Sequence, residues 1–385
     1  MSKQTTPELL AELISFPTVS RESNLALVSF VQDYLVRSGV ECELFFNQGH
    51  TKASLFATIG PRGQSGIVLS GHTDVVPANE QGWTTDPFAM TERDGRFYGR
   101  GTADMKGFIA AVLAAVPALT RRPLRVPVHI ALSYDEEVGC LGVRPMLAEI
   151  AKRIPLPAMC VIGEPTEMRP ILGHKGKLAV RCCVKGHACH SAYSPSGVNA
   201  IEYAARLITR LAEIGERLAQ PGYQDAAFVP PFSTIQTGTV SGGRALNIVP
   251  DECQFDFEVR AIPGLDPVAV QTELNGYAQN ELLPRMRAVH PGANIELQEL
   301  SSYPALSTHP DNSAAKLLAI LCDSQEFGTV AFGSEGGLYS QAGIPTVICG
   351  PGSMEQGHKP NEFIASVQLK ECDSMLERLI EHVRQ

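Results

Sequence analysis

The stretch GIVLSGHTDVVP, which runs from Gly66 to Pro77, decides the fold class of this 385-residue chain. Its apolar, β-branched first half predicts a buried strand over Gly66–Ser70. His72 and Asp74 follow this strand, and a spacing of two places both side chains on one side of extended backbone. Polar side chains after a buried strand are typical of α/β proteins, which bind ligands at the carboxyl ends of their strands.

Outward from this stretch, strand and helix patterns alternate. Apolar residues recur at helical intervals in two segments between Glu8 and Ser38. Further strands are expected at Ser54–Ile59, Val126–Ser133 and Met159–Ile162, and further helices at Met105–Leu119 and Gly142–Ile154. This alternation predicts an α/β fold with a mostly parallel or mixed β-sheet and helices on both faces.

Near Gly176 the pattern changes to a compact α+β insertion. The elements expected there are strands Leu178–Val184, Ser233–Val240, Glu252–Ile262 and Asn294–Leu300, and helices Val198–Leu218 and Pro267–Leu283. After Ser301 the α/β rhythm returns, with helices Asn312–Ser324 and Ser366–Val383 and strands Gly328–Ala331 and Thr346–Cys349. We therefore expect a discontinuous first domain, residues 1–177 and 301–385, and an inserted second domain, residues 178–300.

Composition limits the class of protein and of partner. With 44% hydrophobic and 19% charged residues, the chain can bury a sizeable core, which argues against disorder. A formal net charge of -9 with scattered basic residues argues against nucleic acid as a partner. Met1–Glu12 lacks the pattern of a signal peptide, and the apolar window Phe108–Leu119 is interrupted by Pro117 and too short to span a membrane. We expect a soluble, cytoplasmic protein that acts on a small molecule.

The ten cysteines are scattered and form no C-x-x-C pair, which argues against a disulfide framework or a structural zinc site. Cys182 and Cys183 would point to opposite faces of a strand, although Cys189 lies close by in sequence. We interpret the cysteines as reduced packing residues.

Acidic residues occupy the turns that follow the other expected strands. Asp104 lies in the glycine-rich stretch GRGTADMKG, where a carboxylate would repel phosphate and attract a cation, although a helix N-cap is the alternative. Glu136 and Glu137 follow the strand that ends at Ser133, so one carboxylate can bind metal while the other moves a proton, as metal-assisted hydrolysis requires. A solvated acidic loop is the alternative for this pair.

Glu164 and His358 also follow expected strands, and they complete a set of oxygen and nitrogen ligands. Such a set without a nearby thiolate favours zinc, with cobalt or manganese as alternatives. Asp74 suits a carboxylate that holds the second ring nitrogen of His72, although a simple hydrogen bond at the strand end would also explain this pair. Two divalent ions balanced by three carboxylates and a hydroxide would be close to neutral and therefore compatible with burial.

Five segments resemble the di-zinc amidohydrolase and peptidase family that includes acetylornithine deacetylase and succinyl-diaminopimelate desuccinylase. They are SGHTDVVP from Ser70, GRGTADMKG from Gly99, DEEVG from Asp135, GEPT from Gly163 and the stretch Gly350–His358. The resemblance is nearly full-length. It implies a zinc-binding mixed-sheet domain with helices on both faces, interrupted by a smaller, ferredoxin-like α+β domain for dimerisation or lid closure.

The resemblance also implies a role for each matching position. Asp104 would bridge two zinc ions. Proteins of this family often have a cis peptide bond after the bridging aspartate, which here would be Asp104–Met105. The remaining ligands would be His72 and Glu164 for one zinc ion, and Glu137 and His358 for the other. Glu136 would act as the general acid and base that takes a proton from the attacking water, and Asp74 would orient His72.

In the inserted domain, the stretch KGHACHSAYSPSGVNA resembles the family's lid motif. His190 in this stretch would reach the site of the other subunit of a homodimer and stabilise the oxyanion, although a surface histidine is the alternative and Cys189 replaces the usual glycine. Arg260 and Asn247 would hold the substrate carboxylate. An ion pair of Arg260 with Glu258 or Asp256 is the alternative.

The stretches around Phe332–Tyr339 and Pro351–Glu362 resemble the acetylornithine deacetylase branch of the family. This implies removal of acetyl from N-acetyl-L-ornithine to give ornithine and acetate in arginine biosynthesis, with Glu335 near the substrate ammonium or, alternatively, capping the next turn. A desuccinylase, an aminoacylase or a carboxypeptidase or dipeptidase is the alternative. A catalytically inactive binding module is disfavoured, because Glu136 and every expected ligand are present.

Overall fold

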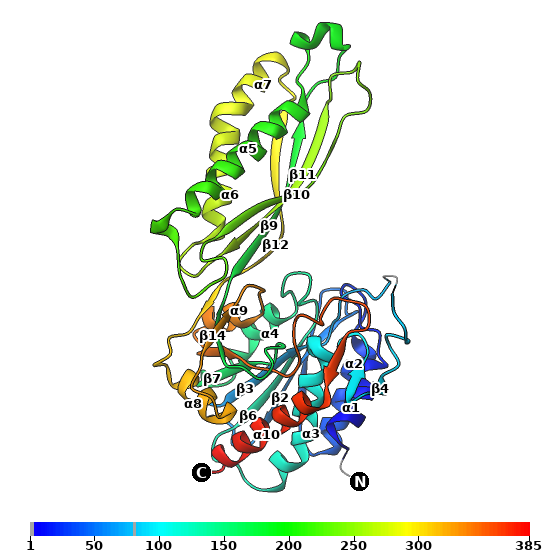
Figure 1. Ribbon diagram of the computed structural model, residues 1–385, viewed down its shortest axis with the longest axis vertical. Helices are drawn as coiled ribbons and strands as arrows, with labels where there is room; N and C mark the ends of the chain where they lie inside the picture. Colours follow the sequence, from blue (N-terminus) through cyan, green and yellow to red (C-terminus); the bar gives the residue numbers. More distant parts are fainter. Residues whose placement is uncertain (1–3, 80–81) are drawn as a thin grey trace. The chain divides into compact units, whose positions relative to one another are not determined.

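The computed structural model describes residues 4–79 and 82–385, and the chain divides into two compact units. The first unit comprises Met1–Gly173, Leu306–Thr329 and Ser334–Gln385, and the second comprises His174–Ala305 and Val330–Gly333. Figure 1 follows the chain through both units. Residues 1–3 of the N-terminal segment Met1–Glu12, where no signal peptide is expected, lie outside the described residues.

A mixed sheet forms the centre of the first unit. Within the described residues it has nine strands in the order β1-β2-β6-β3-β7-β15-β8-β13, with β14 paired to β8. The strands are β1 (Cys42–Phe46), β2 (Ala53–Ile59), β3 (Ile67–His72), β6 (Val128–Ser133), β7 (Met159–Ile162), β8 (Ile171–His174), β13 (Leu306–Ser307), β14 (Gly328–Val330) and β15 (Thr346–Ile348). Strands β6, β3, β7 and β15 run parallel, whereas β2 pairs antiparallel with β6 and β8 pairs antiparallel with β15. The predicted mixed α/β sheet is therefore confirmed.

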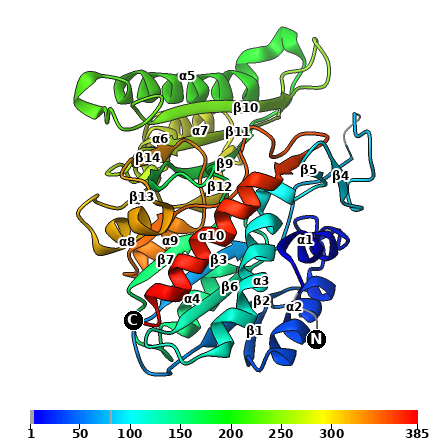
Figure 2. The ribbon, with the colours of Figure 1, turned by 60° about the horizontal axis from the view of Figure 1, so that its bottom comes forward.

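Helices cover both faces of this sheet. Alternating strand residues such as Leu55, Leu69 and Ile130 join one hydrophobic core with residues of five helices. These helices are α1 (Thr6–Ile14), α2 (Leu25–Arg37), α3 (Gly107–Arg121), α8 (Ser313–Cys322) and α10 (Ser366–His382), and Figure 2 shows α10 lying along α3. On the other face, Ser54 bonds to Gly142 at the start of α4 (Val143–Ile150), and Ser70 bonds to Tyr339 of α9 (Gly336–Gln341).

The helical segment Thr102–Arg121 corrects one sequence interpretation. Pro117 does not interrupt it, because α3 continues to Arg121. By length and composition this segment passes as a membrane span, but 89% of its most apolar window is buried inside the protein. It starts with a π-helical turn, η1 (Thr102–Lys106), and then becomes the central core helix.

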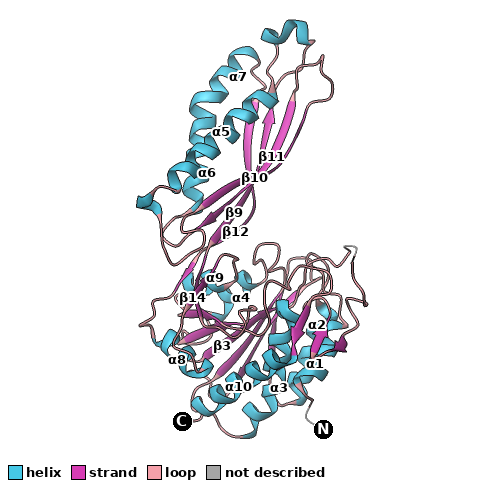
Figure 3. Ribbon diagram, viewed as in Figure 1, coloured by secondary structure: helices cyan, strands magenta, loops and turns pink. Residues whose placement is uncertain are grey.

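The second unit contains a four-stranded antiparallel sheet in the order β10-β11-β9-β12. Its strands are β9 (Gly176–Lys185), β10 (Thr234–Gly242), β11 (Glu252–Ala261) and β12 (Asn294–Tyr303). Helices α5 (Ala200–Leu218), α6 (Pro267–Tyr277) and α7 (Leu283–Val289) lie along this sheet in Figure 3. Residues of β9 alternate between buried and partly exposed, so one face packs on the helices. A dimerisation or lid role for this unit stays a prediction.

A small sheet of β4 (Thr91–Arg93), β5 (Arg96–Tyr98) and β16 (Phe363–Ala365) completes the first unit. It joins the segment before Asp104 to the segment after His358, because β16 pairs antiparallel with β5. Two stretches that are far apart in sequence are thereby held together beside the candidate site.

Candidate metal centre

The candidate ligands gather at the carboxyl ends of the four parallel strands. His72 is the last residue of β3, Glu137 comes shortly after β6, and Glu164 comes shortly after β7. His358 lies in the loop after β15, and Asp104 lies in η1. Parallel strands bring their carboxyl ends to one edge of the sheet, so five separate sequence segments meet there.

Asp104 lies between the two histidines. Its Oδ1 is 3.0 Å from His72 Nε2, and its Oδ2 is 3.2 Å from His358 Nε2. On one side, His72 Nε2 lies 3.8 Å from Glu164 Oε1; on the other, His358 Nε2 lies 3.1 Å from Glu137 Oε2. The arrangement forms two groups of one imidazole and one carboxylate that share the carboxylate of Asp104. Each group could hold one divalent cation.

Burial makes this cluster electrostatically incomplete without a cation. Burial, followed by the charge of Asp104, raises the pKa of Glu137 to about 7 and that of Glu164 well above its ordinary value. Burial also raises the pKa of Glu136, and the neighbouring charge of Glu137 adds to this effect. Closely packed carboxylates are stable in a buried site when cations compensate their charge, so the donor set fits metal ions.

The histidines compensate for part of this negative charge in the protein itself. Hydrogen bonds to Asp104 and Glu137 raise the pKa of His358 to about 10, although burial opposes the shift. Burial lowers the pKa of His72, but bonds to Asp104 and Asp74 outweigh it and raise the pKa well above its ordinary value. Both imidazoles therefore carry protons where a cation would otherwise bind.

Asp74 contacts more groups than the sequence indicated. His72 Nδ1 lies 2.9 Å from the backbone carbonyl of Asp74 and 3.6 Å from its carboxylate Oδ1. The carboxylate accepts hydrogen bonds from the N–H of Glu136 at 3.1 Å and from the hydroxyl of Ser20 at 2.7 Å. The backbone of Asp74 thus fixes the imidazole, and its side chain fixes the turn that carries Glu136.

The structure does not support a solvated loop for the acidic turn. Glu136 is 8% exposed, and its neighbour Asp135 is 6% exposed. Asp135 pairs with the buried ammonium of Lys52 at 2.5 Å and accepts a hydrogen bond from the N–H of Arg21. Lys52 lies 83 positions away from Asp135, which explains why the local sequence left a solvated loop open as the alternative.

Asp104 is not a helix N-cap either. Gly101 holds the N-cap position of η1, and the peptide bond Asp104–Met105 is cis, as the resemblance implied. The carboxylate of Glu362 accepts hydrogen bonds from the N–H groups of Gly101, Ala103 and Asp104 at 2.9 to 3.1 Å.

Glu362 also pairs with the buried guanidinium of Arg100 at 3.0 Å. Sequence reasoning missed Glu362, although the residue ends the quoted stretch Pro351–Glu362. A glutamate between Asn361 and Phe363 gives no indication of which distant backbone it holds.

Glu335 is buried. Its side chain is 1% exposed, and Oε2 lies 3.4 Å from the hydroxyl of Ser70. Its side chain makes no cap hydrogen bond to α9; instead, the hydroxyl of Ser334 accepts from the N–H of Gly336. Burial raises the pKa of Glu335 to about 7. The capping alternative is therefore wrong, and the predicted contact with a substrate ammonium stays a prediction.

The remaining candidates, His190, Asn247 and Arg260, belong to the second unit. The backbones of His190 and Asn247 are neighbours, because the N–H of Ser191 donates to the carbonyl of Asn247 at 3.0 Å. His190 is exposed, and its Nδ1 accepts from the N–H of Ala192. Their roles in catalysis and substrate binding stay predictions.

Arg260 forms the ion pair that its sequence position suggested. Its Nε lies 3.2 Å from Glu258 Oε1, and its Nη1 donates to the hydroxyl of Tyr303 at 2.9 Å. Asp256, the other suggested partner, pairs with Arg181 instead. The guanidinium is thus held in place, which is compatible with a role in carboxylate binding.

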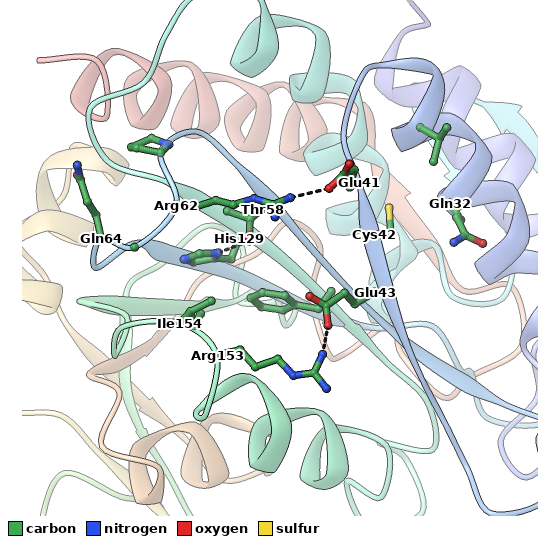
Figure 4. Close-up of a pocket in the computed structure, with 14 residues that line it drawn as sticks. Gln32, Glu41, Cys42, Glu43, Thr58, Arg62, Gln64, His129, Arg153 and Ile154 are labelled. Carbon is green, nitrogen blue, oxygen red and sulfur yellow. Dashed lines mark hydrogen bonds and ion pairs between the residues drawn. The ribbon is translucent and has the colours of Figure 1, made fainter.

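A separate cavity of about 460 Å³ lies in the first unit, and no candidate ligand lines it (Figure 4). His129 of β6 lies in it, stacked on Phe56 and hydrogen-bonded to Thr58 at 2.9 Å. Ion pairs of Arg62 with Glu41 and of Arg153 with Glu43 lie among its lining residues. Burial lowers the pKa of His129 to about 4, so this imidazole is a neutral packing residue.

Comparison with known proteins gives one family. The model of peptidase family M20/M25/M40 matches residues 68–382. The acetylornithine deacetylase of Pasteurella multocida (strain Pm70) is 35% identical over 385 residues, covering 97% of this chain and 96% of that relative. The acetylornithine deacetylase of Proteus mirabilis (strain HI4320) is 34% identical over 383 residues, with the same coverage of 97% and 96%.

Solved structures show the same fold. An M20 family metallo-carboxypeptidase from Sulfolobus solfataricus is similar to this chain with a TM-score of 0.79 and 20% identity, covering 98% of this chain and 99% of its own. A dinuclear metal binding peptidase of the M20 family from Bacillus subtilis has a TM-score of 0.67 and 18% identity, covering 98% and 97%.

Proposed function

We propose, from the premise that this chain belongs to peptidase family M20/M25/M40, that it hydrolyses the acetyl amide of N-acetyl-L-ornithine with the help of two zinc ions. The family consists of hydrolases, so the chain is an enzyme. One observation carries the proposal: the carboxylate of Asp104 lies within 3.0 and 3.2 Å of two imidazoles, each next to its own glutamate. The acetylornithine deacetylases at 34 and 35% identity support the choice of substrate.

The proposed ligands follow from these distances. Asp104 would be shared between the two ions, with His72 and Glu164 on one side and Glu137 and His358 on the other. Bound zinc ions would polarise the amide carbonyl and make water a stronger nucleophile near neutral pH. Cobalt or manganese would also accept this donor set.

Glu136 would move the proton that the reaction requires. Its backbone is fixed by Asp74. Its carboxylate lies within 4.8 Å of ligand atoms of His72 and Glu164, close enough to reach a water between the ions. Because burial raises its pKa, this carboxylate can take a proton from the attacking water, hold it, and pass it to the nitrogen of the leaving amine. The amide C–N bond then breaks, which releases acetate and ornithine.

His190 would stabilise the developing oxyanion across a homodimer, and Arg260 and Asn247 would hold the substrate carboxylate. Glu335, whose carboxylate lies beside the hydroxyl of Ser70, would meet the ammonium of the substrate. We further propose a cytoplasmic enzyme of arginine biosynthesis.

A substrate panel tests this proposal. Purified protein, reconstituted with zinc or cobalt, would be assayed with N-acetyl-L-ornithine, N-acetyl-L-methionine, N-succinyl-L,L-diaminopimelate and a dipeptide. We expect the highest kcat/KM for N-acetyl-L-ornithine. A preference for the succinylated compound would indicate a desuccinylase, and a preference for the dipeptide would indicate a peptidase; either result would contradict the proposed substrate.

A further inference from the structure

Three cysteines from distant segments meet in the first unit, away from the candidate ligands. Cys322 is the last residue of α8, Cys349 follows β15, and Cys372 lies on α10. The Sγ atoms of Cys322 and Cys349 are 3.3 Å apart, and both are free thiols. Cys372 lies close enough to influence the ionisation of both. No local sequence pattern groups them.

The two thiols in contact have different surroundings. Cys322 is partly exposed, whereas Cys349 is fully buried. The hydrogen bond with Cys349, together with the guanidinium of Arg378, lowers the pKa of Cys322. That guanidinium is anchored next to Cys322, because its Nε donates to the carbonyl of Leu321 at 2.5 Å. An accessible thiol beside a cation is the more reactive kind, and the buried thiol is in position to react with it.

We propose that Cys322 and Cys349 form a redox-active dithiol that hydrogen peroxide converts into an intramolecular disulfide. In the first step the sulfur of Cys322 attacks peroxide, the O–O bond breaks, and a sulfenic acid and one water form. In the second step the sulfur of Cys349 attacks that sulfenic sulfur, the S–O bond breaks, and a second water leaves. The thiols lose two electrons in total, and peroxide gains them.

Only a small movement is needed for this reaction. A disulfide has a sulfur separation of roughly 2.05 Å, so the two atoms must approach by about 1.2 Å from their distance of 3.3 Å. Cys322 can supply this movement, because it is the last residue of α8 and its neighbour Asp323 already adopts a left-handed conformation that ends the helix.

The disulfide would affect the contact between the segment after β15 and the segment that carries Glu164. The N–H of Cys349 donates to the carbonyl of Ile162 at 2.9 Å, and Gly350 packs so closely that an added Cβ would lie 2.1 Å from the carbonyl oxygen of Gly163. Glu164 is the next residue. Cys322 can make most of the approach, but any movement of Cys349 would pass through these contacts to this proposed ligand. We therefore expect oxidation to lower turnover several-fold, a consequence that rests on the proposed function.

Peptide mapping tests the dithiol independently of activity. The full-length, metal-loaded protein is treated with hydrogen peroxide and then unfolded in the presence of excess N-ethylmaleimide, which blocks buried thiols as they become exposed, and the digest is analysed by mass spectrometry. We expect a linked Cys322–Cys349 peptide that dithiothreitol removes. The link should disappear in Cys322→Ser and in Cys349→Ala, and it should persist in the control Cys183→Ser, which changes a partly exposed thiol of the second unit.

Each other outcome overturns part of the proposal. Oxidation of Cys322 to sulfinic acid without a link, or a link to Cys372, would overturn the dithiol and leave the proposed hydrolysis untouched. A complete link with unchanged turnover would overturn the regulatory consequence alone. If the link forms but no acetyl amide is hydrolysed even by the reduced protein, the proposed function fails while the dithiol stands.

Discussion

Glu136 and Glu137 are neighbours with different surroundings, and this difference separates their proposed roles. Glu137 lies 3.1 Å from His358, within the ligand group. Glu136 makes no contact with either histidine that is close enough for a hydrogen bond among the described residues, and its carboxylate accepts only from the thiol of Cys140 at 3.5 Å. A carboxylate without a fixed partner is free to exchange a proton with substrate.

Replacing Glu136 by glutamine tests this division. Glu136→Gln keeps the volume of the side chain but removes the proton acceptor, so we expect turnover to fall by at least roughly 100- to 10,000-fold with little loss of metal. Steady-state kinetics and elemental analysis would be compared with the exposed control Glu12→Gln, which should behave like the unaltered protein. Activity near that of the control would rule out Glu136 as the base.

Metal binding should release protons. The pKa of His358 is raised to about 10, so its imidazole is protonated at neutral pH in the metal-free protein, and a ligating nitrogen must lose that proton. We therefore expect metal binding to release at least one proton per chain at about pH 7.5. Metal affinity should rise with pH until the imidazole of His358 is deprotonated. Calorimetric titration with zinc in buffers of different ionisation enthalpy measures the release. Affinity that is independent of pH, with no proton release, would contradict this geometry.

Loops, more than strands, set the precision of the centre. The turn that carries Asp104 is held by Glu362 through three backbone N–H groups, and Glu362 is itself held by Arg100. Residues that fix a ligand in this way commonly affect metal affinity nearly as much as the ligand does.

Glu362→Gln should therefore weaken the centre without touching it. The neutral amide removes the carboxylate charge that pairs with Arg100 and replaces one acceptor oxygen by a donor, so we expect a loss of roughly 10- to 100-fold in metal affinity or activity. Competition with a chromogenic chelator gives the affinity. The exposed substitution Glu371→Gln, near the start of α10, serves as the control. Equal affinity in both variants would show that Glu362 does not position Asp104.

The buried ion pair between Lys52 and Asp135 should contribute to the stability of the turn before Glu136. Its side chains are 7% and 9% exposed, so Lys52→Met leaves a buried, unpaired carboxylate and should lower the free energy of unfolding by roughly 3 to 5 kcal/mol. Urea denaturation measures this loss. The double variant Lys52→Met/Asp135→Asn should recover most of it, and Lys152→Met, which breaks an exposed pair, should cost little. A small loss in Lys52→Met would contradict the account.

Local patterns predicted the elements well and the contacts between them poorly. The strands around Ile67, Val128 and Met159 were found because buried parallel strands read as continuous apolar runs. The short strands β4, β5 and β16 were missed, since three residues give no period. Glu362 lies 258 positions from Asp104, and Lys52 lies 83 positions from Asp135, so no local window could reveal either partnership. Four of the five ligands were recognisable because they lie at or after the end of an expected strand, and Asp104 because it lies in a glycine-rich turn.

The two compact units divide the proposed work between them. The first unit contains every proposed ligand and Glu136, and the second contains His190, Asn247 and Arg260. If His190 acts across a homodimer, two inactive variants should complement each other. We expect mixtures of His190→Ala and Glu136→Gln chains, exchanged under mild denaturation, to recover up to about a quarter of the sites, because each restored site needs one residue from each chain.

Tandem affinity purification of two differently tagged variants would isolate the mixed dimers, and activity would be measured on these samples. No recovery in verified mixed dimers would place His190 in the site of its own subunit or outside catalysis. This outcome would leave the metal centre unaffected.

The central claim is that one cluster of carboxylates and two imidazoles, buried except for the exposed His358, binds a pair of divalent cations. Anomalous diffraction at the zinc absorption edge, from crystals of the zinc-loaded protein, tests it most directly. We predict two peaks per chain, one on each side of Asp104, between His72 and Glu164 and between Glu137 and His358. Zinc at other positions only, or no zinc among these five side chains, would contradict the claim.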